Sequence, residues 1–189
     1  MIISIIIRTY NEERYLNDLL NAISNQTVND HKVEIIIVDS GSTDNTLEIA
    51  NSFNCTIKKI EKVNFSFGRS LNLGCITSNG EILIFISGHC IPANEFWLQN
   101  LINPIIKNEV ILTYGKQIGG TNTKFSELQI FEKYFPIESK IPQIGFFCNN
   151  ANAAILKSEW NKFKFDEDLT GLEDMYLAKK LYDSGLLLG

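Results

Sequence analysis

Cysteine is scarce in this 189-residue chain, and the four residues present are scattered. Cys55, Cys75, Cys90 and Cys148 form no Cys-x-x-Cys pair, and no histidine lies at a spacing typical of a zinc site. The sequence therefore offers no zinc-binding pattern. We interpret the cysteines as small packing residues.

The chain also lacks an excess of basic residues. Its 17 lysines and arginines are outnumbered by 22 acidic residues, and the net charge is −5. A nucleic-acid-binding protein would show a basic stripe, and an electrostatic membrane anchor would need positive charge as well. Both classes are therefore disfavoured.

Long apolar runs are missing too. A transmembrane helix needs about 20 predominantly apolar residues, whereas the longest runs here, such as residues 82–86, have the length of a strand. The N-terminus has no basic segment before its apolar residues and no small-residue cleavage site, so it does not resemble a signal peptide. We expect a cytoplasmic protein without a transmembrane segment, either free or peripheral at the inner face of the membrane.

What the chain does contain is an alternation of strand and helix patterns. Residues 2–7 are almost wholly apolar, which is typical of a central strand buried on both faces. Leu16, Leu19 and Leu20 recur at helical spacing, and we expect Asn11 to cap that helix, with Glu12 in its first turn. Further strands are expected at 33–38, 55–60, 81–86, 110–114 and 152–156. Further helices are expected from about 47 to 53 and at 68–77, 94–103, 125–135 and 173–184, with Pro104 ending or kinking the helix before it.

This order predicts an α/β fold, with a mostly parallel sheet flanked by helices. No linker or repeat interrupts it, so a single domain is expected. In such sheets ligands bind at the carboxyl ends of the strands, and three of these ends carry polar motifs. They are residues 8–13 (Arg-Thr-Tyr-Asn-Glu-Glu), 39–44 (Asp-Ser-Gly-Ser-Thr-Asp) and 87–92 (Ser-Gly-His-Cys-Ile-Pro). Neither Gly-x-Gly-x-x-Gly nor a P-loop motif is present, which argues against a dinucleotide enzyme and a P-loop protein.

These motifs resemble the signature segments of the family 2 glycosyltransferases, whose domain has the GT-A fold. Further segments that match in order and spacing are 67–74 (Phe-Gly-Arg-Ser-Leu-Asn-Leu-Gly), 79–81 (Asn-Gly-Glu), 152–154 (Asn-Ala-Ala), 165–167 (Phe-Asp-Glu) and the Glu-Asp pair at 173–174. The resemblance implies a Rossmann-like sheet and a nucleotide-sugar donor. Family members continue past the Glu-Asp helix, so the resemblance also implies that the single GT-A domain, residues 1–189, is shortened on its acceptor side.

The resemblance further implies that the residues at the strand ends bind the donor nucleotide. Asp39 would accept a hydrogen bond from the base. Because a carboxylate accepts from a ring N–H, uracil or thymine suits it, and the donor would be a UDP or dTDP sugar. Arg69 would contact the base or the pyrophosphate. The implied donor-binding set is Thr9, Tyr10, Asn11, Glu12, Asp39, Ser40, Arg69, Ser87, Gly88 and His89.

Each of these residues has a structural alternative. Asp39 could form a turn or cap a helix, Thr9 and Tyr10 could simply pack, and Arg69 could form a surface ion pair of little energetic weight. For Asn72 the structural role is favoured, with hydrogen bonds to a neighbouring strand end.

At residues 87–89 the chain departs from the family. The family pattern is Asp-x-Asp, whose carboxylates hold Mg²⁺ or Mn²⁺ against the donor's diphosphate. Here Ser87 and His89 stand at the two acid positions. His89 is the one candidate metal ligand among them, suited to Mn²⁺. It could instead donate a hydrogen bond or positive charge to the diphosphate, or only pack at the strand end. We expect weak dependence on a divalent cation.

Glu173 and Asp174 open the last expected helix, where acids are common on electrostatic grounds alone. By resemblance, Asp174 is the general base and Glu173 shapes the donor or acceptor pocket. The implied reaction is an inverting transfer of the sugar to a hydroxyl of a saccharide or glycoconjugate acceptor. The alternative is a nucleotide-sugar-binding module without activity. The missing Asp-x-Asp favours this alternative, and the acidic pair speaks against it.

Overall fold

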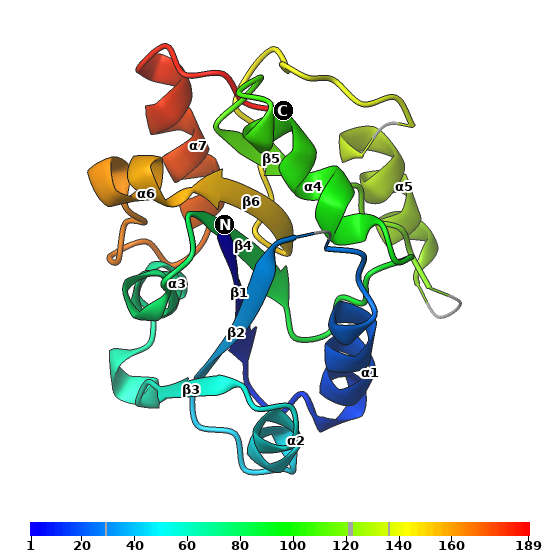
Figure 1. Cartoon of the computed structure of the whole chain (residues 1–189), viewed down its shortest axis with the longest axis vertical. Coiled ribbons are helices and arrows are strands. Elements are labelled where there is room, and N and C mark those ends of the chain that lie inside the picture. Colours follow the sequence, from blue (N-terminus) through cyan, green and yellow to red (C-terminus); the bar gives the residue numbers. More distant parts are fainter. Residues whose placement is uncertain (29, 121–122, 136) are drawn as a thin grey trace.

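The computed structural model describes residues 1–28, 30–120, 123–135 and 137–189. Within them, six strands form one sheet in the order β3-β2-β1-β4-β6-β5 (Figure 1). The pairs β1–β2, β1–β4 and β2–β3 are parallel, whereas β6 runs antiparallel to β4 and β5. The prediction of a mostly parallel sheet is therefore confirmed. The strands are β1 Ile2–Thr9, β2 Lys32–Asp39, β3 Thr56–Lys59, β4 Ile82–Ser87, β5 Leu112–Tyr114 and β6 Asn152–Leu156.

Helices cover both faces of this sheet (Figure 1). One face carries α1 (Glu13–Ser24), α2 (Thr46–Ser52) and α4 (Trp97–Ile106), and the other carries α3 (Phe67–Thr77), α6 (Lys157–Phe163) and α7 (Glu173–Asp183). The structure also describes α5 (Phe125–Tyr134) and a 3₁₀ turn at Lys62–Asn64. No described helix combines the length and apolar character that a bilayer crossing requires.

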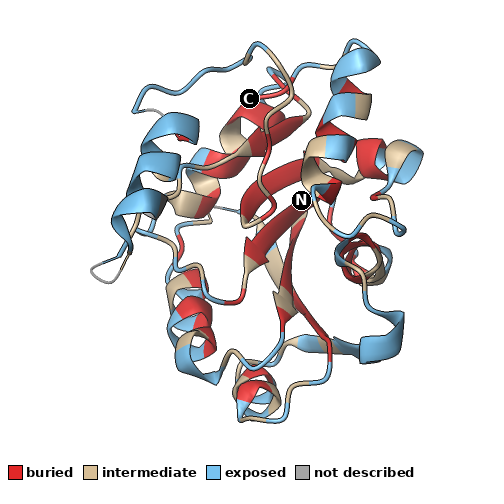
Figure 2. Cartoon of the chain, turned by 180° about the vertical axis from the view of Figure 1, so that it is seen from behind, coloured by how far each residue is buried: buried red, intermediate tan, exposed pale blue. Residues whose placement is uncertain are grey.

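β1 occupies the centre of the sheet because its side chains are apolar toward both layers of helices. Ile3 and Ile7 belong to the core shared with α1 and α4, and Ile6 belongs to the core shared with α3 and α7. All three are fully buried, and Figure 2 shows the central strands of the sheet mostly in the colour of buried residues. Each such burial contributes roughly 1.5–3 kcal/mol. This run of isoleucines fixes the strand in place and leaves Arg8 and Thr9 at its carboxyl end.

The helices differ from the expectations at three points. Asn11 does not cap α1, because the helix begins at Glu13 with Glu12 at the N-cap position, and Asn11 has a φ of 56°. Asparagine tolerates this left-handed conformation better than most residues do. α4 does not end at Pro104 but continues to Ile106, since the apolar face that it buries includes Pro104 itself. α6 was not expected, and it follows β6 with no residue between them.

Candidate active site at the strand ends

The carboxyl ends of β1, β2 and β4 meet at one edge of the sheet. Thr9 pairs with Asp39 in the register of the strands, and Arg8 pairs with Ser87. The residues at these ends line an open cleft of about 170 Å³. Its walls contain seven of the ten predicted donor-binding residues: Thr9, Tyr10, Glu12, Ser40, Ser87, Gly88 and His89. Arg8, Phe65 and Phe67 complete the lining, whereas Asn11, Asp39 and Arg69 are not part of it.

Asp39 is buried, with an exposed fraction of 1 %, and its carboxylate is bonded to its own chain. One oxygen accepts hydrogen bonds from the backbone N–H groups of Gly41 and Ser42, each at 2.9 Å. The other accepts from the hydroxyls of Thr9, at 3.0 Å, and Ser42. Asp39 therefore fixes the turn after β2, the alternative that the sequence left open. Its contact with a base stays a prediction.

The paired loops, residues 10–13 after β1 and 40–46 after β2, bind one another through reciprocal hydrogen bonds. Asn11 Oδ1 accepts from the Thr43 N–H at 2.8 Å, and the Glu12 N–H donates to Thr46 Oγ1 at 2.7 Å. The first turn of α1 is thus capped by the loop after β2, which explains why Asn11 does not cap it. Further bonds join Asn11 with Ser42, and Glu13 with both Asp44 and Asn45.

His89 and Glu12 form a pair in the wall of the cleft. His89 Nδ1 lies 3.0 Å from Glu12 Oε1, and the His89 side chain is 58 % exposed. Gly88 permits this approach, because a Cβ at that position would lie 2.9 Å from Glu12 Cγ. A carboxylate at Nδ1 favours the tautomer that carries its proton there and leaves Nε2 for a ligand.

A divalent cation held by the chain would need several ligand atoms that converge on one point. Within the described residues, no three His, Cys, Asp or Glu side chains form such a group. Ser87 offers a hydroxyl where the family has a carboxylate, and the carboxylates of Glu12 and Asp39 are engaged by His89 and by the turn after β2. The residues at this strand end therefore do not fit a chain-held divalent cation.

The acidic pair lies at the start of α7. Glu173 is 5 % exposed, and burial raises the pKa of its carboxyl. Asp174 accepts hydrogen bonds from the backbone N–H groups of Asn150, at 3.1 Å, and Met175, at 2.7 Å, and these bonds fix its orientation. Leu172 precedes the pair with a φ of 60°, a strained conformation for leucine. Strain of this kind concentrates at functional sites.

Arg8 connects the cleft to the acidic pair. Its Nη1 lies 3.5 Å from Glu173 Oε1, and its Cζ lies 4.8 Å from the centre of the Phe67 ring. Arg8 is absent from the predicted site residues, although a signal was available. A charge at the end of an otherwise apolar strand has to find a partner or a ligand, because burying it alone is costly.

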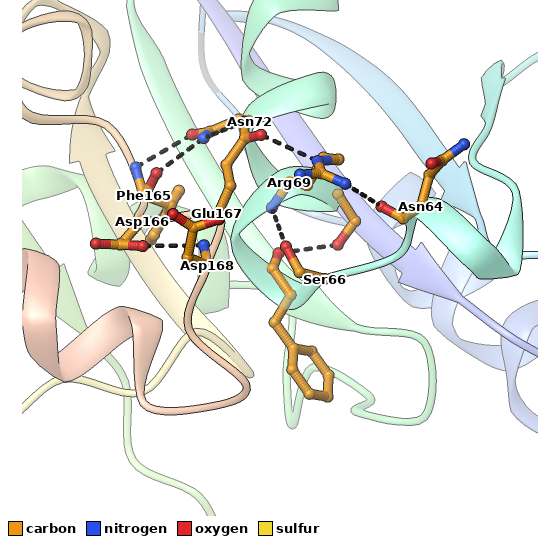
Figure 3. A network of polar contacts seen from close by, with 10 residues as sticks. Asn64, Ser66, Arg69, Asn72, Phe165, Asp166, Glu167 and Asp168 are labelled. Atoms are coloured by element: carbon orange, nitrogen blue, oxygen red, sulfur yellow. Dashed lines mark hydrogen bonds and ion pairs between the residues drawn. The ribbon is translucent and has the colours of Figure 1, made fainter.

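Arg69 lies in a separate network, drawn in Figure 3. Its Nε is 3.0 Å from Glu167 Oε2, and its Nη1 donates to the Asn64 carbonyl at 2.8 Å. Asn72 is buried, and its amide N–H group donates to Glu167 and to the Phe165 carbonyl. The structural role expected for Asn72 is confirmed, but its partners lie in α6 and in the segment after it, not at a strand end. Arg69 forms the surface ion pair that was its alternative, and its contact with a donor stays a prediction.

A second hollow, of about 220 Å³, adjoins the cleft at His89. Trp97, Lys116, Phe131 and Asn152 are among its lining residues, and Trp97 Nε1 donates to Asn152 Oδ1 at 2.8 Å. Aromatic rings with a few fixed polar groups are typical of small-molecule sites. The two hollows have His89 in common, so this side chain lies at the place where they meet.

Ligands of open α/β sheets bind outside the carboxyl ends of the strands, which is where this cleft lies. The fold itself is the GT-A fold of solved glycosyltransferases. Staphylococcus aureus TarS, residues 1–349, solved with UDP-GlcNAc, superposes with a TM-score of 0.73 at 21% identity, over 96% of this chain and 53% of that one. The mannosyltransferase PcManGT of Pyrobaculum calidifontis, solved with GDP-Man and Mn²⁺, superposes with a TM-score of 0.76 at 19% identity, over 98% of this chain and 53% of that one.

Residues 4–162 match the model of the family described as Glycosyl transferase family 2, and the chain belongs to this family. Among its curated relatives is the O-antigen chain rhamnosyltransferase RfbN of Salmonella typhimurium, which is 28% identical over 98% of this chain and 62% of its own length. The poly(ribitol-phosphate) beta-N-acetylglucosaminyltransferase TarS of Staphylococcus aureus is 32% identical over 95% of this chain and 32% of its own. The chain thus spans between about a third and two thirds of the length of these relatives.

Proposed function

We propose that this chain is an inverting glycosyltransferase domain that moves a sugar from a nucleoside-diphosphate donor to a hydroxyl of a saccharide or glycoconjugate acceptor. The single observation that carries the proposal is the Arg8–Glu173 contact of 3.5 Å, which connects the cleft at the strand ends to the acidic pair of α7. A donor in the cleft would then have a carboxylate beside its reacting end.

In this proposal the acceptor oxygen attacks the anomeric carbon opposite the diphosphate, and Asp174 takes the proton of the hydroxyl. Two backbone N–H groups hold the Asp174 carboxylate in place, and its remaining lone pairs are available for that proton. Glu173 is more deeply buried and bonded to Arg8, which suits a residue that shapes the pocket. In its imidazolium form, with one proton on Nδ1 toward Glu12, His89 donates from Nε2 to the departing diphosphate.

The donor we propose is a UDP or dTDP sugar. Asp39 is bonded to Thr9, which lines the cleft, and its carboxylate would accept the ring N–H of uracil or thymine in exchange for the hydroxyl bond from Thr9 or Ser42. The likeness to TarS, solved with UDP-GlcNAc, is consistent with this choice, whereas PcManGT, solved with GDP-Man, makes guanine the natural competitor in any test.

The acceptor would occupy the second hollow, which meets the donor cleft at His89. The relatives named for the O-antigen chain and for poly(ribitol-phosphate) support a glycan or glycoconjugate acceptor. The location belongs to the same proposal: a cytoplasmic protein, peripheral at the inner face of the membrane. Exposed apolar residues on and beside α5 support it, namely Ile118, Phe125, Ile130 and Ile137. Sedimentation with lipid vesicles tests this placement.

The deciding experiment compares Asp174→Asn with the parent. Donor binding is measured by calorimetry, and transfer and donor hydrolysis are measured by release of the nucleoside diphosphate. A positioned base contributes about 10²- to 10⁴-fold, so we expect this variant to bind the donor normally and to lose transfer by that factor. Glu173→Gln is the matched control, and it should change the affinity for donor or acceptor more than the turnover.

Equal turnover in Asp174→Asn and the parent would place the base elsewhere. Binding of the donor by the parent without any transfer or hydrolysis, tested with a panel of glycan acceptors, would instead establish the inactive binding module.

A further inference from the structure

A nucleoside diphosphate would bring concentrated negative charge into a cleft that holds few cationic groups. Among the residues that line it, Arg8 and His89 are the basic side chains, and Glu12 is acidic. His89 carries a positive charge only when protonated, and its Nδ1 is already bonded to Glu12. Arg8 is charged at every accessible pH. The permanent positive charge of the cleft wall therefore belongs to Arg8.

The Arg8 side chain is held in place by its neighbours on both sides. The Phe67 ring lies 4.8 Å from the guanidinium carbon, a distance typical of a cation–π contact. The 3.5 Å contact with Glu173 holds the guanidinium from the side of α7. Such a group loses little conformational freedom when it binds an anion.

Most of the hydrogen-bonding capacity of Arg8 is unused. A guanidinium has five N–H donors, and within the described part of the chain Arg8 makes one hydrogen bond, the long one to Glu173. The side chain is nevertheless only 19 % exposed, and burial lowers its pKa against the opposing effect of Glu173 and Asp174. A charge that is desolvated but poorly paired gains from an anionic ligand with several acceptor oxygens.

The place of Arg8 in the sheet matches that task. It pairs in register with Ser87, the first of the two positions at which the family has a metal-binding carboxylate. The donor set at this strand end does not fit a divalent cation held by the chain, as described above. Because Ser87 is neutral, β4 places no carboxylate at this register position to compete with a diphosphate for Arg8, whose one carboxylate contact among the described residues is the long one to Glu173 on α7.

We propose that Arg8 binds the diphosphate of the donor directly and supplies the positive charge that a chain-held cation supplies elsewhere. The inference rests on the proposed function and adds one residue and one specificity to it. Arg8 makes the site prefer nucleoside diphosphates over monophosphates in the absence of metal. Arg8 is then a binding residue for both the donor and the departing diphosphate.

The test is calorimetry in EDTA with the diphosphate and the monophosphate of one base, chosen by screening UDP, dTDP and GDP. For the parent we expect tighter binding of the diphosphate. Arg8→Gln should lower the affinity for the diphosphate about 10- to 100-fold, the scale of charge-assisted hydrogen bonds, and should change the affinity for the monophosphate less than about threefold. Arg8→Lys keeps the positive charge but lacks the planar guanidinium. Its affinity for the diphosphate should lie between those of the parent and of Arg8→Gln.

Arg14 offers a matched control, because it is an exposed arginine on α1 whose guanidinium lies over the Tyr15 ring, outside the cleft. Arg14→Gln should leave both affinities unchanged. Thermal unfolding of every variant reports whether it is folded. If Arg8→Gln does not fold, a loss of affinity in Arg8→Lys that is specific to the diphosphate tests the inference instead.

Two results would overturn the inference while leaving the proposed function intact. One is an unchanged preference for the diphosphate in folded Arg8 variants. The other is a parent that prefers the diphosphate only when Mn²⁺ or Mg²⁺ is added, since a cation then supplies the charge. A parent that binds no nucleotide at all would refute the proposed function and the inference together.

Discussion

Removal of the Asp39 carboxylate should destabilise the ligand-free domain. In Asp39→Ala, the N–H groups of Gly41 and Ser42 lose a charged acceptor at 2.9 Å, and the Thr9 hydroxyl loses a partner at 3.0 Å. Water reaches Gly41, which is exposed, so each lost N–H bond costs roughly 1–2 kcal/mol. The expected loss in the free energy of unfolding is about 2–4 kcal/mol.

Asp39→Asn should behave differently. Its amide oxygen can accept from both N–H groups, and its NH₂ group can donate to the hydroxyls of Thr9 and Ser42, which rotate to accept. The bonds survive without the charge, so the expected loss is about 1 kcal/mol. For a domain of this size, each kcal/mol lowers the Tm by about 2–4 °C. Thermal unfolding should therefore place the Ala variant about 5–15 °C below the parent and the Asn variant about 2–4 °C below.

Ser40→Ala is the neighbouring control, because it removes one neutral hydrogen bond, from Ser40 Oγ to the Thr9 carbonyl at 3.1 Å, and leaves the turn intact. Its expected loss is about 1 kcal/mol. If Asp39 served only to bind a base, Asp39→Ala would lower the nucleotide affinity alone. A Tm of Asp39→Ala within about 2 °C of the parent, measured without ligand, would refute this structural role of Asp39.

Two further predictions concern the network of Figure 3. Gly68→Ala should lower the free energy of unfolding, measured in urea, by about 1–3 kcal/mol or more. The added Cβ would lie 2.0 Å from the backbone carbonyl oxygen of Asp166, which cannot move aside as a side chain could. An unchanged free energy of unfolding would disprove that contact. Hydrogen bonds from Asn72 and Arg69 lower the pKa of Glu167, so the ionised carboxylate stabilises the fold above its ordinary pKa, and this contribution is lost as the pH falls through the lowered pKa. Glu167→Gln should accordingly be less stable than the parent by under about 1 kcal/mol near neutral pH, with the gap closing in acid; a constant gap from neutral to acid pH would contradict this account.

The layered sheet was predictable because its signals are local. A strand such as β1 is a continuous apolar run, and α1 repeats leucines at helical spacing, so each element is recognised within its own segment. α6 escaped prediction since Lys157 follows Leu156 directly, with no polar break and no capping side chain to mark its start. The end of α4 was not predictable from Pro104 alone, because burial of a helix face outweighs one lost hydrogen bond.

The candidate site was predictable as a set of strand ends but not as a set of contacts. Seven of the ten residues predicted to bind the donor line one cleft, because parallel strands bring their carboxyl ends to the same edge. The partners of those residues are distant in the sequence: Glu12 meets His89 across 77 positions, and Arg69 meets Glu167 across 98. No local sequence pattern indicates such pairings. The contact of Arg8 with Glu173 and the position of Arg69 outside the cleft are therefore visible only in the structure.

The paired loops have a consequence for how this domain can be altered. The segments after β1 and β2 look like two independent signatures, yet the backbone N–H of Thr43 depends on Asn11, and that of Glu12 depends on Thr46. A chimaera whose transplanted loop lacks the equivalent of Asn11 or Thr46 would remove the acceptor of one of these donors. The two loops therefore form one structural unit that should be transplanted whole, and natural sequence changes in one loop should be matched by compensating changes in the other.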